Sequence, residues 1–411
     1  MSQANEGREF EKQVRAVARA IWRAPGEGAP ITIDGRERDC IFFGEDLIHY
    51  IECTIARSPQ KVRDDARKMV SFRERQMRTG KLVKLWIVTM HEPGADQRDE
   101  AKKNGIEIMS LVQFQRHIFD ADHYIQARLN YPFGSATDPG DDSSDLRRVT
   151  YQPTAIRNSQ GKSMDVKSLV EMLRTEGQII CVAGDYGVGK SLLVREVFQR
   201  AVSDFRQTRS LPVPIAINLR DHWGQDDPHE VLHRHATKLG LQTKDQLVRA
   251  FNAGHLLLLL DGFDEITAKP VALRQDLKAI RHYATRVIRE FINHSRGRTG
   301  VLITGREQFF DSQVERLTAL GLRTNDTLAT LAEFSDEEAQ EFLGRHGVGG
   351  RLPPWLPRRP LLLASLVARG VLSNLIDGKI GGLGEADNRD LRKGSSNPQA
   401  AIGRSYYPSA P

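Results

Sequence analysis

The run GDYGVGKS at residues 184–191 constrains the fold more than any other feature of the sequence. Its spacing, G-x-x-x-x-G-K-S, is that of a loop whose backbone N–H groups surround phosphate, because glycines let the chain turn tightly. Residues 178–183 form a short apolar run that predicts a buried strand, and residues 191–202 have the apolar spacing of a helix. Such a helix points its N-terminus at the phosphates. The run therefore predicts an α/β domain built around a nucleotide site.

Each position of this loop has an expected task. We expect Lys190 to reach the β- and γ-phosphates of ATP and the Ser191 hydroxyl to ligate Mg²⁺. The predicted nucleotide-binding residues of the loop are Gly184, Asp185, Tyr186, Gly187, Val188, Gly189, Lys190 and Ser191.

A second motif is the leucine run at 256–260, which ends in Asp261 and continues as GFDE. Five leucines in succession predict a central strand that is buried on both faces. At its carboxyl end we expect Asp261 to hold Mg²⁺ through water. Glu265, or alternatively Asp264, is expected to polarise the water that attacks the γ-phosphate.

Two further motifs follow. Residues 301–306 predict another buried strand, which ends in Arg306. An arginine at this place can sense the γ-phosphate, and the alternative is a surface arginine that caps the strand. A helix is predicted over 335–346, and the apolar stretch 352–372 contains Arg359-Pro360-Leu361.

Together, the runs GDYGVGKS, LLLLLDGFDE, LITGR and RPLLL resemble a NACHT-type NTPase of the signal-transduction (STAND) class over residues 164–376. The resemblance implies ATP hydrolysis, a short helical segment after the NTPase core, and contact between Pro360 and the nucleotide base. For such a switch we expect ATP binding to promote self-association.

The first 133 residues predict a separate compact α/β domain. Its expected order is helix, three strands, helix, strand, helix, strand, helix, beginning with an apolar helical stripe over 8–22. Asp39 borders one of these strands and Glu52 lies on the next. Two carboxylates on adjacent strands can hold a divalent cation that activates water, with Glu11 on the first helix as a third ligand. The expected ion is Mg²⁺ or Mn²⁺.

The residues around these carboxylates resemble an Mrr-type restriction-endonuclease domain of the PD-(D/E)XK superfamily over about residues 1–130. The matching pieces are G-x-x-F-E-x-x-V at 7–14, Arg38-Asp39, and I-E-C-T at 51–54. Thr54 stands where the family has a lysine that stabilises developing charge, and Lys61 or Lys68 on the following helix could take that place. An active nuclease and an inactive DNA-binding or scaffolding module both remain open. An N-terminal nuclease-like domain joined to a NACHT NTPase matches the architecture of bacterial defence proteins.

The stretch from Arg57 to Lys84 contains ten Lys or Arg residues and three acids, beside the predicted carboxylate site. Contact with the phosphates of double-stranded DNA is one interpretation, and a solvated helix face is the other.

Composition sets the remaining expectations. The chain has 411 residues, a formal net charge of +6 and three cysteines without metal or disulfide spacing, which favours a reducing cytoplasm. No signal peptide or membrane-spanning run is expected. The predicted divisions are an endonuclease-like domain at 1–133, a linker at 134–163, a NACHT core at 164–334, a helical segment at 335–380 and a disordered tail at 381–411.

Overall fold

The computed structural model describes residues 3–22, 30–33, 36–44, 46–117, 119–134, 152, 154–174, 178–209, 211–242, 244–266 and 277–378. The chain divides into two compact units. The first comprises the described parts of Met1–Ala136, Ile156–Asp185 and Lys190–Thr330, and the second those of Thr137–Ala155, Tyr186–Gly189 and Leu331–Pro411. The predicted tail lies outside the described residues. No helix in these ranges combines the length and apolarity needed to cross a membrane.

The N-terminal region of the first unit is built on a four-stranded sheet in the order β3-β4-β5-β6, with β3–β4 antiparallel and the other pairs parallel. Its elements are α1 (Gln3–Trp22), β1 (Ile31–Ile33), β2 (Arg36–Arg38), β3 (Cys40–Phe43), β4 (Leu47–Thr54), α2 (Pro59–Met77), β5 (Leu82–Thr89), α3 (Ala95–Lys103), β6 (Glu107–Ser110), α4 (Leu111–Arg116) and α5 (Ala121–Leu129).

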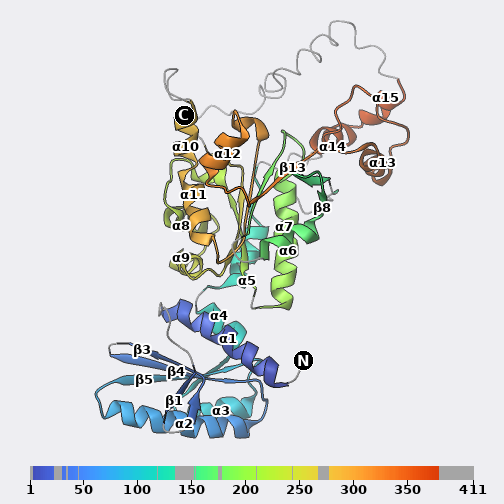
Figure 1. The fold of residues 1–411 in the computed structure, drawn as a ribbon. Helices are drawn as coiled ribbons and strands as arrows, with labels where there is room; N and C mark the ends of the chain where they lie inside the picture. Colours follow the sequence, from blue (N-terminus) through green and yellow to red (C-terminus); the bar gives the residue numbers. More distant parts are fainter. Residues whose placement is uncertain are drawn as a thin grey trace, which may run out of the picture. The chain divides into compact units, whose positions relative to one another are not determined.

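Helices cover both faces of this sheet, α2 and α3 on one and α1 and α4 on the other (Figure 1). The start of α2 is fixed locally, because the Ser58 side chain accepts a hydrogen bond from the Gln60 amide and Pro59 occupies the first turn. Its apolar stripe, with Val62 and Met69 fully buried, packs against the sheet. Most charged residues of α2 are exposed or half-buried, whereas Asp65 is fully buried.

Two elements of this region were not among those predicted. The short strand β2 pairs antiparallel with β1. Helix α5 begins after Asp120, whose side chain accepts a hydrogen bond from the His123 amide. Its buried side includes Arg128 as well as Tyr124 and Ile125. A buried arginine interrupts the apolar period by which a helix is found, so this helix gave no clear signal.

A seven-stranded sheet forms the rest of the first unit, in the order β10-β11-β12-β9-β13-β7-β8. Strands β10, β11, β12, β9 and β13 are parallel, and β12 lies between β11 and β9. The elements are β7 (Ile156–Asn158), β8 (Ser163–Met164), α6 (Val166–Arg174), β9 (Ile179–Ala183), α7 (Lys190–Gln207), β10 (Val213–Asn218), the 3-10 turn η2 (Leu219–His222), α8 (Pro228–Lys238), α9 (Lys244–Asn252), β11 (Leu256–Asp261), α10 (Leu277–Ala284), α11 (Arg286–Ser295), β12 (Val301–Gly305), the 3-10 turn η3 (Glu307–Phe309), α12 (Gln313–Leu320) and β13 (Thr327–Leu331).

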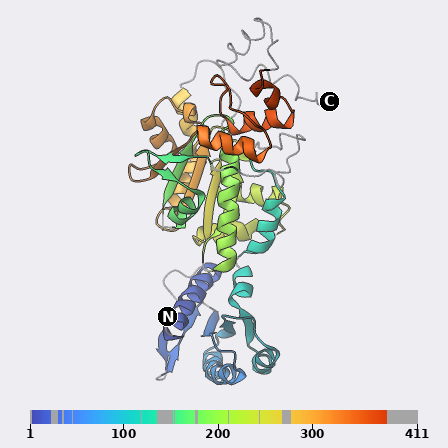
Figure 2. The ribbon, with the colours of Figure 1, turned by 90° about the vertical axis from the view of Figure 1, so that its right-hand side faces the viewer.

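Helices α6 and α7 lie on one face of this sheet and α8 and α11 on the other, and α7 runs along the strands in both views (Figures 1 and 2). Strands β9, β10 and β11 are buried along their whole length. Such burial on both faces is typical of a parallel sheet in an α/β domain. The hairpin β7–β8 extends the sheet, so the end of the predicted linker is part of the folded unit.

The second unit has three helices among its described residues. It contains α13 (Asp336–Arg345), α14 (Pro360–Ala368) and α15 (Leu372–Ile376). Helix α13 starts with a capping box in which Ser335 and Glu338 each accept a hydrogen bond from the other's backbone amide. Phe334, Phe342 and Leu363 belong to its apolar core.

Candidate functional site

The phosphate-binding loop connects β9 to α7, as its sequence predicted. Gly187 and Gly189 have φ angles of 81° and 100°, in the left-handed region that favours glycine. The Lys190 ammonium donates to the carbonyl oxygens of Gly184 and Asp185, both at 2.8 Å. Burial lowers the pKa of Lys190, and the nearby carboxylate of Asp264 opposes that shift. The lysine therefore lies partly desolvated at the base of the loop, where an anion would gain most from it.

Asp261 lies at the carboxyl end of β11, beside the strand that separates β11 from β9. Its Oδ1 accepts a hydrogen bond of 2.6 Å from the Thr304 hydroxyl on β12. Burial raises the pKa of the Asp261 carboxyl, and the neighbouring hydroxyls of Thr304 and Ser191 oppose the rise. Oδ2 is buried and has no hydrogen-bond partner among the described residues. An unpartnered carboxylate oxygen beside the Ser191 hydroxyl is a donor set that suits Mg²⁺.

Asp264 and Glu265, the two candidates for polarising water, have different surroundings. Asp264 accepts hydrogen bonds from the Arg306 backbone amide at 3.0 Å and from its guanidinium Nε at 2.9 Å. Glu265 is half-buried, and its side chain has no hydrogen bond or ion pair among the described residues. Burial raises its pKa, and the charges of Asp261 and Asp264 add to the rise. These surroundings favour Glu265 as the base and leave Asp264 to hold Arg306.

Pro360 lies in the second unit, at the start of α14. The next residue, Leu361, donates its backbone N–H to the Gly187 carbonyl oxygen at 3.1 Å. Arg359, the residue before, pairs with Glu333 at 2.7 Å. Pro360 is thus fixed from both sides next to the tip of the loop.

The two predicted carboxylates of the N-terminal region lie near each other. Asp39 Oδ2 accepts the Cys53 backbone N–H at 2.7 Å, which ties Asp39 to the strand that carries Glu52. The pKa of Glu52 is raised to about 7, mainly by burial and next by the negative charge of Asp39. Burial also raises the pKa of Asp39. A divalent cation would relieve this repulsion, so the pair suits a metal site.

Lys68 supplies a cation at this pair. Its ammonium lies 3.0 Å from Glu52 Oε2 and 2.9 Å from Asp65 Oδ1. The Tyr50 hydroxyl donates to the other Glu52 oxygen, Oε1. Burial by itself lowers the pKa of Lys68, but the charges of Glu52 and Asp65 outweigh it and the net shift is upward. Of the two lysines considered as substitutes, Lys68 is the one in contact with Glu52.

Asp65 was missed as a site residue. It is fully buried, and Lys61 contacts the same oxygen as Lys68 does, at 2.8 Å. Its Oδ2 has no hydrogen-bond partner among the described residues. The sequence did contain a signal for this ion-pair cluster. Asp65 has one lysine four positions before it and another three positions after it, and such spacings bring side chains together on a helix.

The two other residues predicted for this metal site, Thr54 and Glu11, have contacts of their own. Thr54 is buried on β4, and its hydroxyl oxygen accepts the Ala56 amide at 3.1 Å. Glu11 on α1 pairs with Arg15 at 3.7 Å. Within the described ranges, no group of three or more His, Cys, Asp or Glu side chains is placed to hold one metal ion.

The basic stretch is partly committed to internal contacts. Arg63 pairs with Glu100, Arg67 pairs with Asp64, and Arg73 donates to the backbone carbonyl oxygens of Asn104 and Gly105. Arg63 and Arg67 nevertheless remain at the surface, with 46% and 71% of their side chains exposed.

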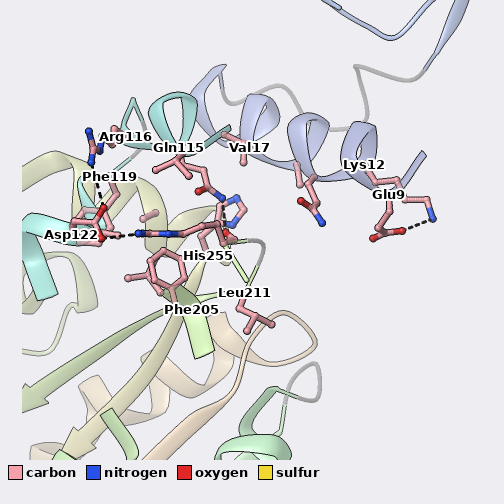
Figure 3. A pocket seen from close by; sticks show the side chains of 17 residues that line it. Glu9, Lys12, Val17, Gln115, Arg116, Phe119, Asp122, Phe205, Leu211 and His255 are labelled. Carbon is pink, nitrogen blue, oxygen red and sulfur yellow. Dashed lines mark hydrogen bonds and ion pairs between the residues drawn. The ribbon is translucent and has the colours of Figure 1, made fainter. Parts of the chain in front are cut away.

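A cavity of about 330 Å³ lies elsewhere in the first unit. Figure 3 shows Val17 and Lys12 of α1 on one side and Phe205, Leu211 and His255 on the other. None of the predicted site residues lines it. It belongs to neither site described above.

The parallel sheet, the loop and the Ser191–Asp261 pair define a P-loop NTPase domain. Residues 178–347 match the model of the NACHT domain family, so this segment is a NACHT domain. The match does not extend to the N-terminal region. A search of curated proteins found no match.

Among solved structures, a DNA replication initiation factor aligns with 12% identity and a TM-score of 0.29, covering 56% of this chain and 62% of that one. The replication initiator DnaA bound to AMPPCP and single-stranded DNA aligns with 14% identity and a TM-score of 0.31, covering 60% and 69%. The Aeropyrum pernix Orc1 protein in complex with DNA aligns with 18% identity and a TM-score of 0.30, covering 56% and 59%. The chain thus spans less than two thirds of the first of these structures.

Proposed function

We propose that this chain is an ATP- and Mg²⁺-dependent switch NTPase that controls an N-terminal endonuclease-like domain acting on double-stranded DNA, in defence against phage or other foreign DNA. The observation that carries the NTPase part is the convergence of Lys190, Ser191 and Asp261 at one edge of the parallel sheet. The defence role follows from the resemblance of the two joined domains to bacterial defence proteins.

Each side chain of the nucleotide site has a task that its surroundings support. Lys190 exchanges its two carbonyl contacts for the β- and γ-phosphates, to which a partly desolvated ammonium binds strongly. Mg²⁺ would neutralise phosphate charge, with Ser191 and Asp261 as its holders. Glu265, whose side chain has no hydrogen bond or ion pair among the described residues, accepts a proton from the attacking water. Arg306, held by Asp264, faces the γ-phosphate as the sensor of hydrolysis.

At the N-terminal site, Lys68 takes the task that the missing E-x-K lysine would have, which is to stabilise charge on the scissile phosphate. Asp39 and Glu52 would hold Mg²⁺ or Mn²⁺. ATP-dependent self-association would bring two such sites to one duplex, because each strand needs its own cut.

The second candidate is a nucleotide-binding regulator or scaffold whose N-terminal domain binds DNA without cleaving it. It is favoured by one observation, namely that both oxygens of Glu52 already have partners, Lys68 and Tyr50.

One experiment separates the two candidates. Purified protein is incubated with supercoiled plasmid in Mn²⁺, with and without ATP, alongside Asp39→Ala. ATP-stimulated nicking that Asp39→Ala abolishes supports the endonuclease. Intact plasmid together with equal DNA affinity of the two proteins, measured by fluorescence anisotropy, supports the non-cleaving regulator. ATP-dependent growth in particle size, measured by light scattering, tests self-association.

A further inference from the structure

The segment that follows α5, residues 131–134, lies against the magnesium side of the nucleotide site, although it contains no nucleotide-binding motif. We call this segment the strap. A carbon atom added to Gly134 would lie 2.3 Å from Ser191 Oγ and 2.5 Å from Asp261 Oδ2. Gly134 also has a φ of 56°, in the left-handed region. The backbone of Gly134 therefore fills the space beside both oxygens, and only a residue without a side chain fits there.

Arg128 of α5 binds the backbone of the strap. It is fully buried, and its guanidinium donates to the carbonyl oxygens of Ala216 at 2.6 Å, Tyr131 at 2.8 Å and Pro132 at 3.2 Å. The guanidinium carbon lies 3.7 Å from the centre of the Phe133 ring. No carboxylate pairs with Arg128 among the described residues. A buried cation is costly to desolvate unless it has hydrogen-bond partners. Because Arg128 finds two of these partners in the strap, moving the strap away would leave the guanidinium with unmet donors.

Asn218 also binds the backbone of the strap. It ends β10, in register with Asp261 at the end of β11. Its Oδ1 accepts the Gly134 N–H at 3.0 Å, and its Nδ2 donates to the Pro132 carbonyl oxygen at 2.9 Å. Arg128 donates to the same Oδ1 at 3.0 Å. The strap is thus anchored at the sheet edge that carries the magnesium ligands.

We propose that Arg128 and Asn218 are positioning residues that hold the strap over Ser191 and Asp261, and that Mg²⁺-nucleotide binds only when Gly134 withdraws. This rests on the proposed nucleotide function. Asp261 Oδ2, buried without a hydrogen-bond partner among the described residues, is the group a cation would satisfy, and Gly134 covers it. Because the strap is continuous with α5, its withdrawal links occupancy of the nucleotide site to the N-terminal part of the chain.

Hydrogen exchange of the full chain, read by mass spectrometry, tests the movement. The three states are free protein, protein with the β,γ-imido analogue of ATP in EDTA, and protein with the same analogue in Mg²⁺. We expect Mg²⁺ to speed exchange several-fold in peptides that cover the strap, while the loop at 184–191 becomes protected. A protected loop with unchanged or slower exchange at the strap would overturn the proposal alone. An unprotected loop would overturn the proposed nucleotide site as well.

Substitutions test whether the strap and the Mg²⁺-nucleotide compete for the space beside Ser191 and Asp261. Asn218→Ala removes two contacts of the strap and should lower the Mg²⁺ concentration for half-maximal analogue binding about tenfold, with unchanged binding in EDTA. Gly134→Ala should act in the same direction, because the added methyl group keeps the strap away. Gly161→Ala is the matched control, because Gly161 also has a positive φ, of 78°, but open space around it. It should leave the Mg²⁺ concentration for half-maximal analogue binding unchanged. If Asn218→Ala and Gly134→Ala both raise the Mg²⁺ requirement in folded protein, the strap completes the site and does not compete for it.

Discussion

Replacing Glu52 by Gln should remove a pH dependence of stability from the N-terminal region. Glu52 is 1% exposed, and its pKa rises from 4.5 to about 7, mainly because it is buried. A group whose pKa is higher in the folded state stabilises that state below its unfolded pKa, and the stabilisation is lost as pH rises to the folded pKa. At 1.36 kcal/mol per pKa unit, the loss between pH 4.5 and 8 is roughly 3 kcal/mol, as an order of magnitude.

Urea unfolding of the full chain at pH 5 and pH 8 measures this effect. Trp86 is buried in the N-terminal region, whereas Trp223 and Trp355 are 60% and 64% exposed, so tryptophan fluorescence follows mainly that region. Wild type should lose stability between the two pH values, and Glu52→Gln should lose much less. Glu107→Gln, at an exposed position of β6, is the control and should behave as wild type. An equal loss in wild type and Glu52→Gln would show that Glu52 does not titrate in this window.

Three further outcomes are expected. Lys190→Ala should lose ATP binding by at least about tenfold in equilibrium titration, because one cation facing the phosphates is removed, and equal affinity would contradict the assignment of the loop. Glu265→Gln should retain ATP but slow phosphate release by about 10²-fold or more, whereas wild-type turnover would mean that the base lies elsewhere. If the endonuclease is active, Lys68→Ala should lower plasmid cleavage far more than Lys61→Ala, since only Lys68 contacts Glu52, and Thr54→Lys should have little effect. The reverse order of the two lysine variants would assign the charge-stabilising task to Lys61.

The sequence by itself identified the nucleotide-binding loop, the strand that ends in Asp261 and the arginine after a buried strand. These were predictable because each motif is local: the loop needs glycines in fixed positions, and a strand buried on both faces needs an unbroken apolar run. The match of residues 178–347 to the NACHT domain confirms the predicted NACHT NTPase domain, and the roles of its single residues stay predictions. The Mrr-like assignment of the N-terminal region stays a prediction.

Only the tertiary structure decided which residues meet. Strand order places β12 between β9 and β11, which brings Thr304 to Asp261 and Arg306 to Asp264. It also distinguishes Glu265 from Asp264 by their partners, and Lys68 from Lys61 by its contact with Glu52. Helix α5 and the strap gave no sequence signal, because a buried arginine that binds carbonyl oxygens has no periodic pattern. Their place beside Ser191 and Asp261 depends on contacts between segments far apart in the chain, which local spacing does not encode.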